Sequence, residues 1–61
     1  MSLPESQRRT YERRLAQLEA SADRLSRLLM GADADEAARL CHRLEAIDIE
    51  MDLLREALGA P

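Results

Sequence analysis

The sequence predicts an all-α protein, a two-helix antiparallel hairpin with coiled-coil-like packing, on three observations. Apolar residues recur at alternating spacings of three and four over two long segments, which is the period of helices that pack along one stripe. A short segment containing Gly31 and Asp33 separates the two. Tyr11 is the only aromatic residue, so the chain lacks the aromatic side chains that are typical of strands.

The first helix is expected at about 3–30. Its apolar residues follow spacings of 4, 3, 4, 3 and 4, and these residues form its part of the hairpin seam: Tyr11, Leu15, Leu18, Ala22, Leu25 and Leu29. Ser2 and Glu5 have the spacing of a capping box, and Pro4 is tolerated in a first turn. Gly31 is expected in the left-handed conformation that closes many helices.

The second helix is expected at about 34–58, with Asp33 as its N-terminal cap and Glu36 in the capping-box position. Its first seam residues are Ala37, Leu40 and Leu44, and the same spacing continues to Leu58. A turn of about three residues, 31–33, joins helices that lie antiparallel. Residues 1–61 are therefore predicted to form a single helical hairpin.

The second helix carries more apolar surface than one neighbouring helix can cover. At 100° per residue, the apolar side chains of residues 46–58 fill an arc of about 200°, whereas the seam of the first helix spans about 80°. A chain this short also buries too little surface alone to be comfortably stable. We therefore expect the second helix to lie in the middle of an assembly, either with a second copy in a four-helix bundle or with a larger helical protein. The predicted partner interface comprises Ala46, Ile47, Ile49, Glu50, Met51, Leu53, Leu54, Ala57 and Leu58.

Three further side chains each have two interpretations. Glu50 falls inside the apolar arc, where a carboxylate either pairs with an arginine and fixes register or extends to solvent at the interface edge. Cys41 and His42 are adjacent, which suggests a metal or a nucleophile, but they point about 100° apart and no second Cys or His completes four ligands. We predict no metal and no cofactor, with Cys41 in the interface or core and His42 on the surface.

Charge differs between the two halves of the chain. Residues 1–30 hold six Arg against four acids, and residues 31–61 hold three Arg against eight acids. The basic residues of the first helix are interpreted as a solvated surface, with phosphate contact as the alternative: Arg8, Arg9, Arg13 and Arg14. The acids of the second helix fall within about 80° and are interpreted as a solvated face rather than as paired catalytic carboxylates: Glu45, Asp48, Asp52 and Glu56.

The motifs of enzymes and of membrane proteins are not found in the sequence. It has no glycine-rich phosphate loop and no spacing typical of a catalytic triad, so we expect no enzymatic activity. The first residues contain no apolar region of a signal peptide, and no stretch approaches the roughly 18 uncharged residues of a membrane span. We expect a cytoplasmic protein that does not enter a membrane.

The segment from Asp33 to Glu36, followed by Ala38, Leu40, Cys41 and Leu44, resembles the turn and early second helix of the Rop family. These plasmid regulators are dimers of helical hairpins that bind RNA. The resemblance covers residues 33–44 and loses register at Asp48, where the family pattern would place a core residue. By turn register, the RNA-facing positions correspond to Arg13, Gln17, Ser21 and Leu28, of which only Arg13 is charged. The resemblance therefore implies the family's architecture more than its RNA binding.

The turn Gly31-Ala32-Asp33 and the aliphatic stretch from Leu44 to Leu54 are similar to the small needle-subunit co-chaperones of type III secretion systems, of the YscE, PscE and SsaE type. The alignment requires a gap of about one helical turn. It implies a cytoplasmic hairpin that packs on a helical-repeat chaperone and helps to keep a polymerising needle subunit soluble. The sequence thus predicts a non-enzymatic protein-interaction module, with such a co-chaperone as one form and a Rop-like homodimeric RNA-binding regulator as the alternative.

Overall fold

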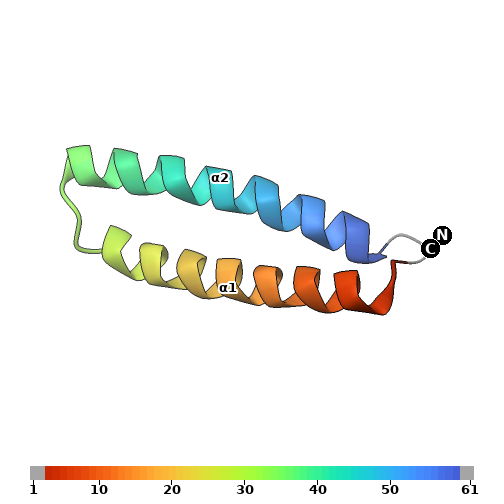
Figure 1. The fold of residues 1–61 in the computed structure, drawn as a ribbon. Helices are drawn as coiled ribbons and strands as arrows, with labels where there is room; N and C mark the ends of the chain where they lie inside the picture. The colour runs from red at the N-terminus through yellow and green to blue at the C-terminus, as the bar shows by residue number, and fades with distance from the viewer. Residues whose placement is uncertain (1–2, 60–61) are drawn as a thin grey trace.

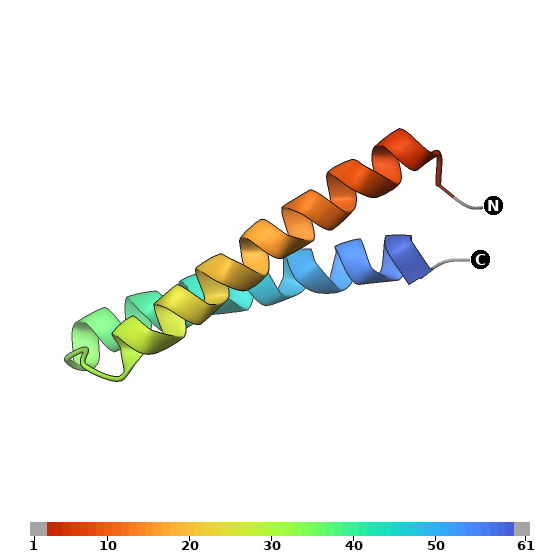
Figure 2. The same cartoon turned by 90° about the horizontal axis from the view of Figure 1, so that it is seen from below.

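The computed structural model describes residues 3–59. It contains two helices, α1 (Glu5–Leu29) and α2 (Ala34–Gly59), which run antiparallel and side by side (Figure 1). A view at right angles shows that the two helices cross along their length (Figure 2). The predicted all-α hairpin is therefore confirmed, and Glu5 and Gly59 lie together at the end opposite the turn.

The start of α1 lies two residues later than predicted. Pro4 precedes the helix with φ −56° and ψ 147°, and its carbonyl accepts a hydrogen bond from the amide of Arg8 at 2.9 Å. Pro4 thus occupies the cap position rather than the first turn. Proline is tolerated there because its φ is fixed at about −65° and because no helical hydrogen bond requires an amide at that position. The other member of the predicted capping box, Ser2, lies outside the described residues.

The left-handed conformation predicted for Gly31 is wrong, since no described glycine has a positive φ. Met30 is still right-handed helical, at φ −63° and ψ −26°. The amide of Met30 then bonds the carbonyl of Arg27 at 3.3 Å, and the amide of Gly31 bonds that of Leu28 at 3.2 Å. These hydrogen bonds join residues three positions apart, as in a 3₁₀-helix, and they satisfy the carbonyls of the last turn. The chain therefore leaves α1 without a left-handed residue.

We expect Gly31→Ala to stabilise the hairpin by about 0.4–1 kcal/mol, because alanine reduces the freedom of the unfolded chain. A Cβ at this position meets nothing within 4 Å, and the backbone is not in the region that favours glycine. Urea unfolding followed by circular dichroism measures the change. A loss of stability would show that Gly31 is left-handed in solution after all.

The predicted cap of α2 is confirmed. The Asp33 Oδ1 atom accepts a hydrogen bond from the amide of Glu36 at 2.9 Å, and the Asp33 carbonyl accepts one from the amide of Ala37 at 2.8 Å. The aspartate also places negative charge at the positive end of the helix dipole. Asp33 therefore fixes where α2 begins, and with it the length of the turn.

The interior of the hairpin is a single line of side chains between the two helices. Four residues are only 5–6% exposed: Leu18, Leu25, Leu40 and Met51. The other predicted seam residues are half-buried: Tyr11, Leu15, Ala22, Leu29, Ala37 and Leu44. The Cα atoms extend over 46 × 14 × 11 Å, so the molecule is a rod in which each helix has only one neighbour.

Candidate protein-interaction surface

An apolar stripe lies on α2 on the side away from α1. Ile49 is 63% exposed and Leu53 is 61% exposed, and Ala46 beside them is also exposed. On a helix these three residues fall within about 60° of one another. We call Ala46, Ile49 and Leu53 the outer stripe, and it is the part of the predicted partner interface that the hairpin itself leaves in solvent.

The other residues of the predicted interface lie nearer to α1. Met51 is buried, and Ile47, Leu54 and Leu58 are half-buried, because they continue the seam that Ala37, Leu40 and Leu44 begin. Ala57 and Glu50 are half-buried as well. A partner that covers α2 therefore contacts chiefly the outer stripe and Ala57, since α1 already occupies much of the remaining arc.

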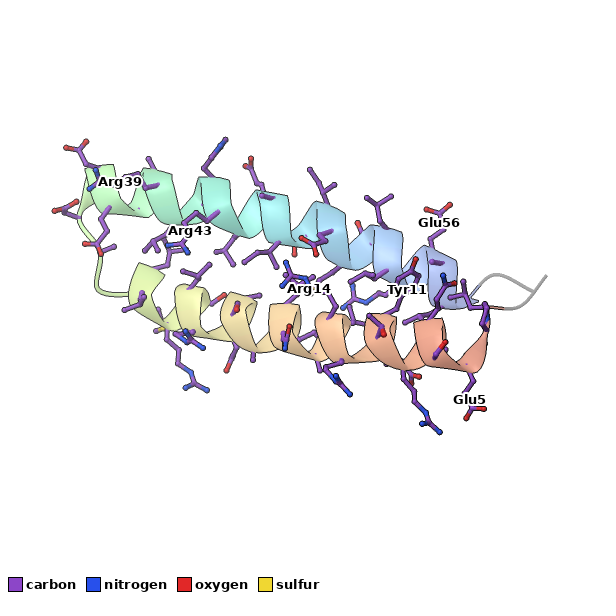
Figure 3. The ribbon with its side chains drawn as sticks, in the orientation of Figure 1. Glu5, Tyr11, Arg14, Arg39, Arg43 and Glu56 are labelled. Atoms are coloured by element: carbon purple, nitrogen blue, oxygen red, sulfur yellow. The ribbon has the colours of Figure 1, made fainter. Side chains whose placement is uncertain are left out.

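Glu50 forms a two-pronged ion pair with Arg14 of α1. The Arg14 Nε atom lies 2.7 Å from Glu50 Oε2, and Nη2 donates to Oε1 at 3.3 Å. Both side chains remain about half exposed, at 50% and 44%. Figure 3 shows Arg14 reaching from α1 toward α2, near the middle of the rod. Both interpretations of Glu50 thus hold in part, since it pairs with an arginine while staying at the edge of the seam.

This partner of Glu50 was missed at the sequence level, although the turn contains the signal for it. Ala32 stands at the middle of the turn, and residues 14 and 50 are each eighteen positions from it. In an antiparallel hairpin such residues lie level with one another. The pair could therefore have been predicted from two facts: Glu50 lies beside the seam of the second helix, and Arg14 lies opposite it on the first.

The ion pair makes the titration of Glu50 depend on Arg14. The hydrogen bond from Arg14 lowers the pKa of the Glu50 carboxyl below its usual 4.5, and the Arg14 charge adds to this against partial desolvation. A carboxyl whose pKa is lower in the folded state stabilises the fold above its ordinary pKa. That contribution is lost as the pH falls through the lowered value.

We expect Arg14→Gln to raise the pKa of Glu50 toward 4.5, as measured by NMR titration of its side-chain carboxyl. The matched control is Arg13→Gln, because Arg13 is the adjacent, exposed arginine of the same helix. The control should leave the Glu50 titration unchanged. Equal shifts in both variants would mean that general charge, not this contact, sets the pKa.

An acidic edge borders the outer stripe. Glu45, Asp52 and Glu56 are exposed and fall within about 40° of one another, next to Ile49. Asp52 lies 3.7 Å from Arg55, while no ion pair of Glu45 or Glu56 occurs within residues 3–59. Figure 3 shows Glu56 pointing away from α1. We call Glu45, Asp52 and Glu56 the acidic edge, and two of its three charges are not neutralised within the hairpin.

The four arginines in the first half of α1 do not form one cationic surface. Arg9 pairs with Glu5 at 3.1 Å on the same helix, and Arg14 pairs with Glu50. Arg13 is exposed, whereas Arg8 is half-buried. Half of these charges therefore have an acidic partner within the protein itself.

Cys41 is exposed, so of its two predicted places the core is excluded and the partner interface remains a prediction. The residue lies just outside the seam, next to the buried Leu40. His42 is also exposed and, with Ala38, Arg39 and Arg43, lines a shallow depression of about 400 Å³ on α2. All four residues belong to α2, and the depression lies on the N-terminal side of Ala46, the first residue of the outer stripe.

The described residues 3–59 contain neither a membrane-spanning helix nor a metal-binding cluster. Neither α1 nor α2 combines the length and the apolar character that a membrane-crossing helix requires. No group of three or more His, Cys, Asp and Glu side chains within the same residues is placed to hold a metal ion.

In comparisons with known proteins, no family, no curated protein and no solved structure matches this chain. The fold class is therefore defined by the hairpin itself, and its exposed surfaces are the features that indicate a function.

Proposed function

We propose that this chain is a non-enzymatic protein-interaction module whose outer stripe packs against a helix of a partner. The observation that carries the proposal is the exposure of Ile49 and Leu53, at 63% and 61%, on consecutive turns of one helix face. Single exposed apolar residues are common on protein surfaces, but aligned ones on a helix are typical of a docking face.

The total surface of the chain supports this proposal. The hairpin exposes 4825 Å², whereas a compact monomer of 6.9 kDa is expected to expose about 4000 Å². The excess of about 800 Å² equals the area that one partner contributes to a protein–protein interface of standard size. One further helical surface on this rod would thus bring its exposure to that of an ordinary folded protein.

The more specific form of the proposal is a small cytoplasmic co-chaperone of a type III secretion needle subunit. It is supported by the turn around Gly31 and by the aliphatic second helix, which are the features on which the similarity depends. The groove of a helical-repeat chaperone is the kind of site that a single apolar helix face fits.

The RNA-binding alternative has less support, because it requires the arginines of α1 to meet phosphates. Arg9 and Arg14 are already paired with Glu5 and Glu50, and the chain has a net charge of −3. Phosphate binding weakens steeply as salt rises, whereas apolar docking does not. An RNA mobility shift at low salt that disappears at moderate salt would favour the alternative.

Site-specific photocrosslinking tests the proposal. A photoreactive phenylalanine analogue replaces Ile49 in the full chain, which is expressed in its native cell and irradiated. We expect a discrete protein adduct from position 49, because the outer stripe lies at the interface. The matched control places the same analogue at Glu19, an exposed residue of α1.

The adduct should also depend on the apolar character of the stripe, so adding Leu53→Ser to the crosslinking chain should remove it. Equal adducts from positions 49 and 19 would contradict the proposal, as would an adduct that is unaffected by Leu53→Ser. The mass of the adduct further distinguishes a second copy from another protein.

A further inference from the structure

We propose that the occupant of the outer stripe is an amphipathic helix with lysine or arginine along the edge that faces Glu45, Asp52 and Glu56, and not a second copy of this chain. This inference rests on the proposed function and names the chemistry of the partner. It follows from the charges on either side of the stripe and from what these charges do when two identical hairpins pair.

The acidic edge gives a helical partner an electrostatic preference. Glu45 and Glu56 are about three turns apart along α2 and adjoin Ile49 and Leu53 on the same side. A helix that covers the stripe brings its own flanking residues beside these carboxylates, and such flanking charges select partner and orientation in paired helices. Basic residues at those positions neutralise the acidic edge, whereas acidic ones repel it.

Self-pairing through the stripe lacks this complementarity in either orientation. In an antiparallel pair the same edges of the two helices face each other, so each acidic edge would lie beside the acidic edge of the other copy. In a parallel pair, a flanking residue of one copy faces the residue about five positions further along the other copy. Glu45 would therefore lie beside Glu50 of the other copy. Glu50 is already engaged by Arg14, so this contact provides no new opposite charge.

A pair of designed peptides tests the inference on the full chain. Each peptide has about 18 residues, enough for a helix of about 27 Å, with the same leucine and alanine stripe. One carries lysine at the flanking positions and the other carries glutamate. We expect the lysine peptide to bind at least tenfold more tightly by fluorescence anisotropy, and the double variant E45K/E56K to reverse this preference.

Matched variants keep the outcomes distinct. Ile49→Ser should weaken the lysine peptide by more than tenfold while the circular dichroism spectrum is unchanged, because Ile49 lies outside the seam. Equal binding of the two peptides, or a dimer in sedimentation that Ile49→Ser abolishes, would overturn the inference while the proposed function stands. Binding of neither peptide, combined with a monomer and no crosslink from position 49, would overturn both.

Discussion

Leu25→Ala should cost about 2–4 kcal/mol of the free energy of unfolding, the typical cost of removing a buried leucine side chain. Leu25 is 6% exposed and lies between the two helices. Its removal would leave a cavity that only α2 could move to fill. A protein of this size is held by roughly 3–9 kcal/mol in total. The variant is therefore expected to lose roughly half of its stability, and thermal melting by circular dichroism should show a clearly lower midpoint.

Leu28→Ala is the matched control for this prediction. Leu28 belongs to the same helix and undergoes the same change, so helix propensity contributes equally, but it is 52% exposed. Its cost should be less than about 0.5 kcal/mol. Equal losses in the two variants would mean that a second surface covers Leu28 in solution.

The second large effect concerns binding rather than folding. Ile49→Ala combined with Leu53→Ala should weaken binding of the lysine-flanked peptide by about 100-fold, since each truncation removes roughly 1.4 kcal/mol of apolar contact. The free energy of unfolding should change by less than about 0.5 kcal/mol. Titration calorimetry and urea unfolding of the same variant measure the two quantities.

The buried Leu18 provides the reverse case, because it is 5% exposed and does not belong to the outer stripe. Leu18→Ala should reduce stability strongly and, at temperatures where the hairpin is folded, leave peptide affinity nearly unchanged. Were the stripe variant to lose stability and keep its affinity, the partner would have to bind elsewhere on the rod.

Much of the fold follows from the spacing of apolar residues and from one cap. The predicted ranges 3–30 and 34–58 differ from the observed helices by at most two residues at any end, because the seam spacing and Asp33 both restrict where a helix can begin. The conformation of Gly31 was not predictable in this way. A short turn can close through bonds over three residues or through a left-handed residue, and both use a glycine readily.

The surface was harder to predict because it depends on how the two helices are set against each other. The sequence identified the wide apolar face of the second helix, but only the hairpin separates Met51, which α1 covers, from Ile49 and Leu53, which it does not. Likewise Glu50 has no partner within four residues of itself, and its pair with Arg14 spans 36 positions. Such contacts depend on register across the seam and not on local pattern.

The antiparallel course of α1 and α2 also has a mechanical consequence. Because the start of α1 and the end of α2 lie at the same end of the rod (Figure 1), a force that draws these two helix ends apart would separate the helices one layer at a time, from Tyr11 toward Leu29. Such unzipping meets low resistance at each step, whereas sliding the helices lengthwise would strain all layers together. An unfoldase that pulls on either end of this chain would therefore need to overcome only one small barrier at a time.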